Sequence, residues 1–132
     1  MKVDGHCHCG RIAFDAEVDP DLATICHCTD CQRLSGSPFR ASVPAPAAHF
    51  RLRGEPKTYV KTAESGAKRV QAFCGDCGTP IYSTALESPT SYSLRLGTIS
   101  QRAALAPKRQ IWRRSALSWT DRLMGLPAGE KD

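Results

Sequence analysis

The chain has 132 residues, a length that suits one domain with a modest core. Its hydrophobic fraction is 41%, and no apolar run approaches the roughly 20 residues that a membrane-spanning helix needs. The formal net charge of +5 is moderate, and basic residues do not alternate with aromatic residues that could stack on bases, so neither a membrane nor nucleic acid is an expected partner.

The first third of the chain predicts short extended segments separated by turns. Arg11–Val18 alternates apolar and polar residues and predicts a half-buried strand that ends in a turn at residues 19–21. Its apolar face consists of Ile12, Phe14, Ala16 and Val18. Leu22–Ile25 is expected to be extended as well. Cys31–Ser37 predicts a short helical turn that Gly36 and Pro38 stop.

The middle of the chain continues the pattern of short strands. Pro44 and Pro46 are expected to break one run into two strands, Phe39–Val43 and His49–Arg53. Gly54-Glu55-Pro56 then predicts a turn.

A hairpin and two further strands are predicted beyond residue 57. Thr58–Thr62 and Lys68–Phe73 flank Glu64-Ser65-Gly66, which is typical of a hairpin turn. Thr79–Ser83 predicts a short strand, and Ser91–Leu96 another that Gly97 ends. The inward residues of that last strand are expected to be Tyr92, Leu94 and Leu96.

The C-terminal region offers little regular structure. Arg102–Arg114 is rich in basic residues and is interpreted as a solvated face, with an anionic ligand or acidic partner as the alternative. Ser118–Met124 predicts a helical turn, and Trp112 and Trp119 are expected to pack in the core or in a lid. Together the elements predict a mainly β single domain over residues 1–126, followed by a polar tail over residues 127–132.

The seven cysteines carry the functional signal. The start of the chain lacks the apolar stretch of a secretory signal, which favours a cytoplasmic location where thiols stay reduced and more often bind metal than form disulfides. The cysteines fall into three groups: Cys7-His8-Cys9, Cys26-His27-Cys28-Thr29-Asp30-Cys31 and Cys74-Gly75-Asp76-Cys77. Pairs at such spacings can hold one zinc, because a tight turn brings both sulfurs within about 2.3 Å of it.

Two pairings are compatible with the spacing. Cys7 and Cys9 can join Cys74 and Cys77 in a closed site of four thiolates, which leaves Cys26, Cys28 and Cys31 as a second site. Alternatively, Cys26 and Cys28 join Cys74 and Cys77. We favour the first pairing, since a clip that closes a longer loop removes more entropy from the unfolded chain.

A site with three cysteine ligands leaves one coordination position for water or substrate. Three thiolates around Zn²⁺ give a net charge of about −1, so such a metal suits capture of a soft thiolate ligand better than strong activation of water. The site could instead be closed by a fourth protein group such as His27. If residues 26–28 are extended, however, the His27 side chain points away from the neighbouring sulfurs, which leaves it beside the ligands or substrate, or as an ordinary histidine. His6 and His8 meet the same objection beside the first pair, and His49 lies far from every cluster.

Residues beside the three-cysteine group could admit a ligand. Ser35–Phe39 is a loop of small and hydroxyl-bearing residues, and Arg33 and Arg40 flank it with positive charges that could attract a carboxylate. A plain turn with surface arginines is the alternative.

Three segments together resemble the glutathione-dependent formaldehyde-activating enzyme family, which also includes the centromere protein V type. The segments are Gly5-His6-Cys7-His8-Cys9-Gly10, Cys26-His27-Cys28-Thr29-Asp30-Cys31-Gln32-Arg33 with Gly36-Ser37-Pro38-Phe39, and Phe73-Cys74-Gly75-Asp76-Cys77-Gly78-Thr79-Pro80-Ile81. Leu96–Ile99 and Pro107–Trp119 add weaker similarity, so that the resemblance spans roughly residues 3 to 120 in the same order.

The resemblance implies antiparallel sheets pinned by a structural zinc on Cys7, Cys9, Cys74 and Cys77. It implies a second, catalytic zinc on Cys26, Cys28 and Cys31, hence two zinc ions per chain. The founding activity joins glutathione and formaldehyde to form S-hydroxymethylglutathione and is classed in reverse as a carbon–sulfur lyase activity. This chain is shorter at both ends than the founding enzymes, so parts of a glutathione pocket could differ.

The resulting hypothesis is a zinc-dependent carbon–sulfur lyase that acts on a thiol such as glutathione and a small aldehyde. Two other classes of function remain compatible with the residues: a zinc-stabilised binding module without catalysis, and a sensor of thiols or metals. The oligomeric state does not follow from the sequence.

Overall fold

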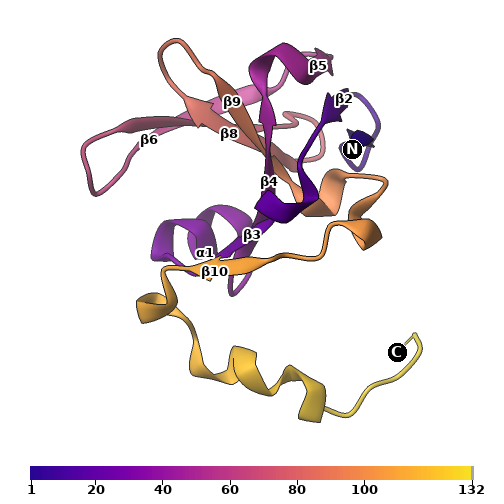
Figure 1. The fold of residues 1–132 in the computed structure, drawn as a ribbon, viewed down its shortest axis with the longest axis vertical. Coiled ribbons are helices and arrows are strands. Elements are labelled where there is room, and N and C mark those ends of the chain that lie inside the picture. The colour runs from indigo at the N-terminus through magenta and orange to yellow at the C-terminus, as the bar shows by residue number, and fades with distance from the viewer. Residues whose placement is uncertain (132) are drawn as a thin grey trace.

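The computed structural model describes residues 1–131, in which ten strands form two sheets (Figure 1). The strands are β1 (Lys2–His6), β2 (Ala13–Glu17), β3 (Thr24–Cys26), β4 (Arg40–Pro46), β5 (Phe50–Arg53), β6 (Lys57–Thr62), β7 (Lys68–Phe73), β8 (Pro80–Ala85), β9 (Ser91–Arg95) and β10 (Arg109–Ile111). One sheet has the order β1-β2-β5, and the other has the order β10-β3-β4-β9-β8-β7-β6. Every pairing is antiparallel except that of β10 with β3, so the expected mainly β, antiparallel fold is confirmed.

In the three-stranded sheet, the apolar face predicted for Arg11–Val18 faces the core. All four residues of the expected apolar face are buried: Ile12, Phe14, Ala16 and Val18. The sequence does not predict β1, because its alternation of apolar and polar residues is incomplete. Val3 faces inward, but the next inward position is Gly5, which has no apolar side chain. A Cβ atom at Gly5 would lie 2.3 Å from Cζ of Phe14 and 2.4 Å from the backbone oxygen of Thr98. Only glycine lets β1 pass this close to its neighbours.

The run forms two strands, as expected over Phe39–Val43 and His49–Arg53, but the predicted break at the two prolines is wrong. β4 is continuous from Arg40 to Pro46 and includes both prolines, and the break lies at Ala47–His49. β3 pairs only with residues 40–42 of β4, so the prolines lie where the strand has β9 on one side and no strand on the other. A missing N–H is tolerated at such a position because it can face away from the ladder. The second expected strand begins one residue late, as β5.

The hairpin of β6 and β7 is confirmed, with Gly66 at φ +88° in its turn. β8 begins and ends slightly later than the expected Thr79–Ser83. Leu94 and Leu96 are buried as predicted for the β9 segment, and Tyr92 is half-buried against the core.

The helical segments are short. α1 covers Thr29–Ser35 and begins two residues before the expected start, because Cys28 caps its N-terminus. Gly36 ends the helix in a left-handed conformation, φ +63°, as expected. The rest are 3-10 segments: η1 (Pro20–Leu22), η2 (Ala47–His49), η3 (Leu96–Thr98), η4 (Arg102–Ala104), η5 (Arg113–Ser115) and η6 (Ser118–Gly125).

The C-terminal region departs most from the sequence expectations. The basic segment contains an additional strand, β10, although its side chains are exposed as expected for a solvated face. Trp112 and Trp119 are 43% and 47% exposed, so the expectation that they pack in the core is wrong. From η6 onward the chain runs along one side of the molecule, below α1 and β10 in Figure 1.

The core lies between the two sheets. Phe50 of β5 contacts Tyr92 of β9 and Tyr82 of β8, with ring centroids 4.6 and 5.5 Å apart. Val43, Ile81 and Leu94 of the larger sheet are fully buried in the same cluster as Phe14. Among the described residues, no helix is long and apolar enough to cross a bilayer.

Candidate metal centres

One cluster of four cysteine sulfurs joins the two sheets. Cys7 and Cys9 follow β1, whereas Cys74 and Cys77 lie in the connection between β7 and β8. The four sulfurs all lie within 4.8 Å of one another, with 3.6 Å between those of Cys7 and Cys9 and 3.8 Å between those of Cys9 and Cys74. Sulfurs bound tetrahedrally at about 2.3 Å from a zinc stand about 3.8 Å apart. The donor set therefore fits a metal ion without rearrangement.

Backbone and hydroxyl donors surround the four-sulfur cluster. The N–H of Ile12 donates to Sγ of Cys7 over 3.3 Å, and the hydroxyl of Thr79 lies 3.2 Å from Sγ of Cys77. The turn that follows Cys77 in the β7–β8 connection needs Gly78, because its φ of +78° is one that other residues rarely adopt. Donors of this kind stabilise thiolates, the form of cysteine that binds metals.

The four sulfurs do not ionise equally. The Thr79 hydroxyl, followed by the backbone N–H groups of Thr79 and Cys9, lowers the pKa of Cys77 to about 5. The N–H of Arg11 favours the Cys9 thiolate, but desolvation and the neighbouring sulfurs outweigh it and raise the pKa of Cys9 to about 12. Negative charges this close oppose one another unless a cation lies between them.

The second cluster is local in sequence. Cys26 ends β3, Cys28 is the N-cap of α1, and Cys31 lies in the first turn of that helix. Their three sulfurs lie within 4.8 Å of one another, and the N–H of Cys31 donates to Sγ of Cys28 over 3.3 Å. Within residues 1–131, no histidine, aspartate, glutamate or further cysteine joins this group. The three sulfurs could therefore hold a metal that keeps one position for an external ligand.

The thiolates of the three-sulfur cluster also oppose one another's ionisation, so the pKa values of Cys28 and Cys31 shift in opposite directions. Burial and the neighbouring sulfurs raise the pKa of Cys31 to about 12, against the opposing charge of Arg40. Burial also opposes ionisation of Cys28, but the N–H of Cys31, the neighbouring thiols and the charge of Lys61 outweigh it and lower the pKa of Cys28.

His27 lies between the ligand-bearing cysteines but is turned away from them. It is 2% exposed, its Nε2 lies 2.7 Å from Oε1 of Gln110 in β10, and its ring packs edge-on against Phe39 at 5.6 Å. It is therefore absent from the group of sulfurs, as the extended geometry of residues 26–28 indicates. His8 is exposed, and His49 lies in η2, with its Nδ1 3.4 Å from a carboxylate oxygen of Glu17.

The two arginines that flank the Ser35–Phe39 loop, Arg33 and Arg40, line different hollows. Ser35 Oγ donates to the backbone oxygens of Gln32 and Phe39, so this hydroxyl is used within the loop. Arg33 faces a hollow that Trp119 also lines, whereas Arg40 lines a different cavity of about 220 Å³. Arg40 stands directly opposite Cys26 in the β3–β4 pairing, so the two side chains share one face of the sheet.

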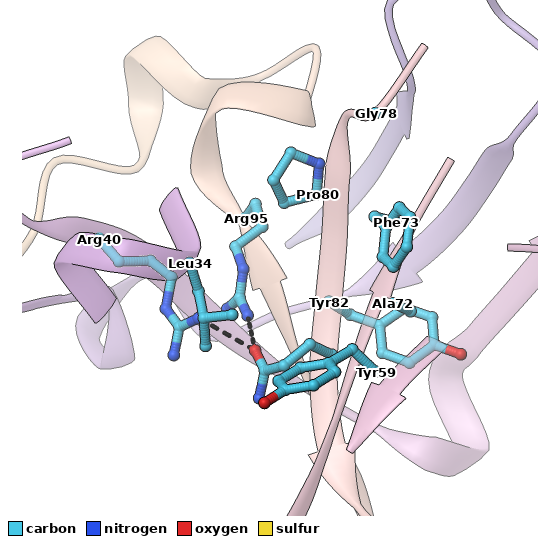
Figure 2. A pocket seen from close by; sticks show the side chains of 10 residues that line it. Leu34, Arg40, Tyr59, Ala72, Phe73, Gly78, Pro80, Tyr82 and Arg95 are labelled. Atoms are coloured by element: carbon cyan, nitrogen blue, oxygen red, sulfur yellow. Dashed lines mark hydrogen bonds between the residues drawn. The ribbon is translucent and has the colours of Figure 1, made fainter. Parts of the chain in front are cut away.

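Sequence reasoning missed the polar residues on the other walls of this cavity. Arg40 and Arg95 both donate to Oε1 of Gln71, over 3.0 and 3.1 Å (Figure 2). They come from β4, β9 and β7, which belong to one sheet, with β8 between β9 and β7, and are distant along the chain. No local pattern marks them; Arg95 is marked only by being the one charged residue of β9, at the end of that strand.

The fold and the two clusters define a small, mainly β protein with two sets of cysteines that could hold metal ions. The chain belongs to the glutathione-dependent formaldehyde-activating enzyme family, whose sequence model matches residues 2–115. The fold is also similar to the crystal structure of a Rhodobacter sphaeroides protein solved as a Northeast Structural Genomics target, with a TM-score of 0.62 and 20% identity. The similarity covers 81% of this chain and 98% of that chain.

Proposed function

We propose that the protein is a zinc-dependent enzyme of the carbon–sulfur lyase type, with glutathione and formaldehyde as its thiol and aldehyde. The observation that carries the proposal is the three-sulfur cluster of Cys26, Cys28 and Cys31, which has no fourth protein ligand among residues 1–131. Arg40, the cross-strand neighbour of Cys26, lines a cavity of about 220 Å³. Membership of the family supports the choice of substrates.

Two zinc ions per chain would have different roles, one structural and one catalytic, within one domain over residues 1–126. Cys7, Cys9, Cys74 and Cys77 would close a structural site, because four thiolates complete a tetrahedral shell. Cys26, Cys28 and Cys31 would hold the zinc ion of the catalytic site, which would leave one coordination position for the sulfur of the substrate and would favour its thiolate form.

The reaction that we propose needs little chemical activation. The sulfur of the thiol forms a bond to the aldehyde carbon, the C=O double bond becomes a single bond, and the thiol proton ends on the former carbonyl oxygen. Nothing is oxidised or reduced, and the reverse reaction breaks the same C–S bond. Because the addition also proceeds without an enzyme, the chain contributes chiefly by holding the two reactants together in a cavity.

Metal content and exchange kinetics test the proposal. The protein purified under reducing conditions should carry two zinc ions, of which mild chelation removes one while the fold survives. At catalytic concentrations it should accelerate exchange between free glutathione and its formaldehyde adduct, seen as NMR line broadening. Two zinc ions without any acceleration would contradict the enzyme and favour a binding module.

A further inference from the structure

A cavity of about 220 Å³, lined by Arg40, the cross-strand neighbour of Cys26, concentrates positive charge without a carboxylate. Arg40 and Arg95 converge on one amide oxygen, that of Gln71, and Arg69 precedes Gln71 by two residues on the same face of β7. Among residues 1–131, none of these three arginines is within ion-pair distance of an aspartate or glutamate. Figure 2 shows the hydrogen bonds of Arg40 and Arg95 as dashed lines that meet at one shared oxygen atom.

Two of these polar side chains are deeply buried and incompletely bonded. Arg95 and Gln71 are each 7% exposed, and neither Nε of Arg95 nor Nε2 of Gln71 has a hydrogen-bond partner. A buried guanidinium without a counter-charge is costly, and buried donors in folded proteins are almost always satisfied. Burial, followed by the repulsion of Arg40, lowers the pKa of Arg95 to about 9. The pocket is therefore short of negative charge.

The neighbouring metal cluster does not supply enough of that charge. Three thiolates around Zn²⁺ give a net charge of about −1, against three guanidinium groups. The nearby Asp30 is already paired with Lys61 over 2.9 Å. Two of the three guanidinium charges are left without compensation, so the chemistry of the pocket favours an anion from outside.

We propose that Arg40, Arg95 and Gln71, here called the arginine pocket, bind a carboxylate of the thiol substrate while the three-sulfur cluster receives its sulfur. Guanidinium groups and amide N–H donors match the two oxygens of a carboxylate. Arg40 is the cross-strand neighbour of Cys26, which places the pocket within reach of one small substrate. The protein would thereby select thiols that carry a carboxylate a few bonds from the sulfur. The inference rests on the proposed function only for the identity of this substrate.

Binding measurements on metal-loaded protein test the pocket separately from catalysis. S-Methylglutathione keeps both carboxylates of glutathione but has no free thiol, so its affinity reports the carboxylate site without requiring turnover. Replacing Arg40→Gln should weaken binding of S-methylglutathione by about 10- to 100-fold in calorimetry, the range for loss of a charged hydrogen bond. Arg40→Lys should recover part of the loss, because it restores the charge but not the planar fork.

The control is Arg51→Gln, which removes an exposed arginine from β5 and should leave affinity unchanged. A second measurement needs no variant: glutathione with both carboxyl groups converted to amides should bind the wild-type protein more weakly than glutathione, by the same factor of about 10 or more. Equal affinity for the acid and the diamide, or undiminished binding by Arg40→Gln, overturns the arginine pocket.

The outcomes separate the two proposals. Carboxylate-dependent binding of S-methylglutathione without any acceleration of exchange would uphold the pocket and refute the lyase. Acceleration with equal efficiency on glutathione and its diamide would uphold the lyase and refute the pocket.

Discussion

The two cysteine clusters use the same side chain in opposite structural settings. In the four-sulfur cluster, Cys9 and Cys74 are 65 residues apart, and the cluster joins the end of β1 to the connection between β7 and β8. The three-sulfur cluster takes all its ligands from residues 26–31 and crosslinks nothing distant. Because closure over a long loop stabilises a fold more than closure over a short one, we expect the four-sulfur cluster to contribute stability and the three-sulfur cluster to contribute little.

The largest effect is expected from Cys77→Ser. A hydroxyl is a poor ligand for zinc, and metal binding at structural sites is worth about 10–16 kcal/mol, as much as the whole stability of a typical domain. The variant should lose cooperative thermal unfolding by circular dichroism, together with both metals. A sharp, wild-type melting transition would show that the four-sulfur cluster does not hold the sheets together.

A smaller loss of stability is expected from Gly5→Ala. This variant strains β1, the strand that leads to Cys7, but leaves the four sulfurs in place. The added methyl group would lie 2.4 Å from the backbone oxygen of Thr98, which cannot move aside as a side chain would. We expect a decrease in the free energy of unfolding of about 1–3 kcal/mol in urea titrations. Gly97→Ala is the control, because a Cβ there meets no atom within 4 Å; an equal loss in both variants would contradict the steric cause.

The smallest effect on stability is expected from Cys28→Ser, although it should abolish acceleration of glutathione exchange. Serine is a good N-cap, so its hydroxyl can accept the N–H of Cys31 in place of the sulfur. The free energy of unfolding should change by less than about 1 kcal/mol, while one of two zinc ions is lost. If Cys28→Ser and Cys77→Ser destabilise the protein equally, the division between the clusters is wrong.

Local patterns in the sequence predict much of the fold. The alternation in residues 11–18 and the turn residues between β6 and β7 are enough to place those strands, because each signal lies within a few neighbouring residues. β1 and β10 escape such reasoning. β1 depends on a glycine that fits against Phe14, and β10 is an exposed strand defined by its partner β3 rather than by its own side chains.

Paired spacing is a strong local signal that marks the cysteine groups, and the structure brings together the two sets of sulfurs of the favoured pairing. The choice between the two pairings could not be made by spacing, since it depends on where β1 and the β7–β8 connection meet. Arg95 and Gln71 could not be predicted as neighbours for the same reason: 24 residues separate them, and their side chains meet only across β8, which lies between β9 and β7 in the sheet.

The contact between His27 and Gln110 spans 83 residues, and Gln32 makes a similar bond to the backbone oxygen of Ser115. The four cysteines of the four-sulfur cluster and the Thr79 hydroxyl beside them, by contrast, all precede residue 80. During synthesis from the N-terminus, the ligands of the four-sulfur cluster have thus all been made before β10. The surroundings of Cys26, Cys28 and Cys31 become complete only when almost the whole chain has been made, so the site acquires its final shape last.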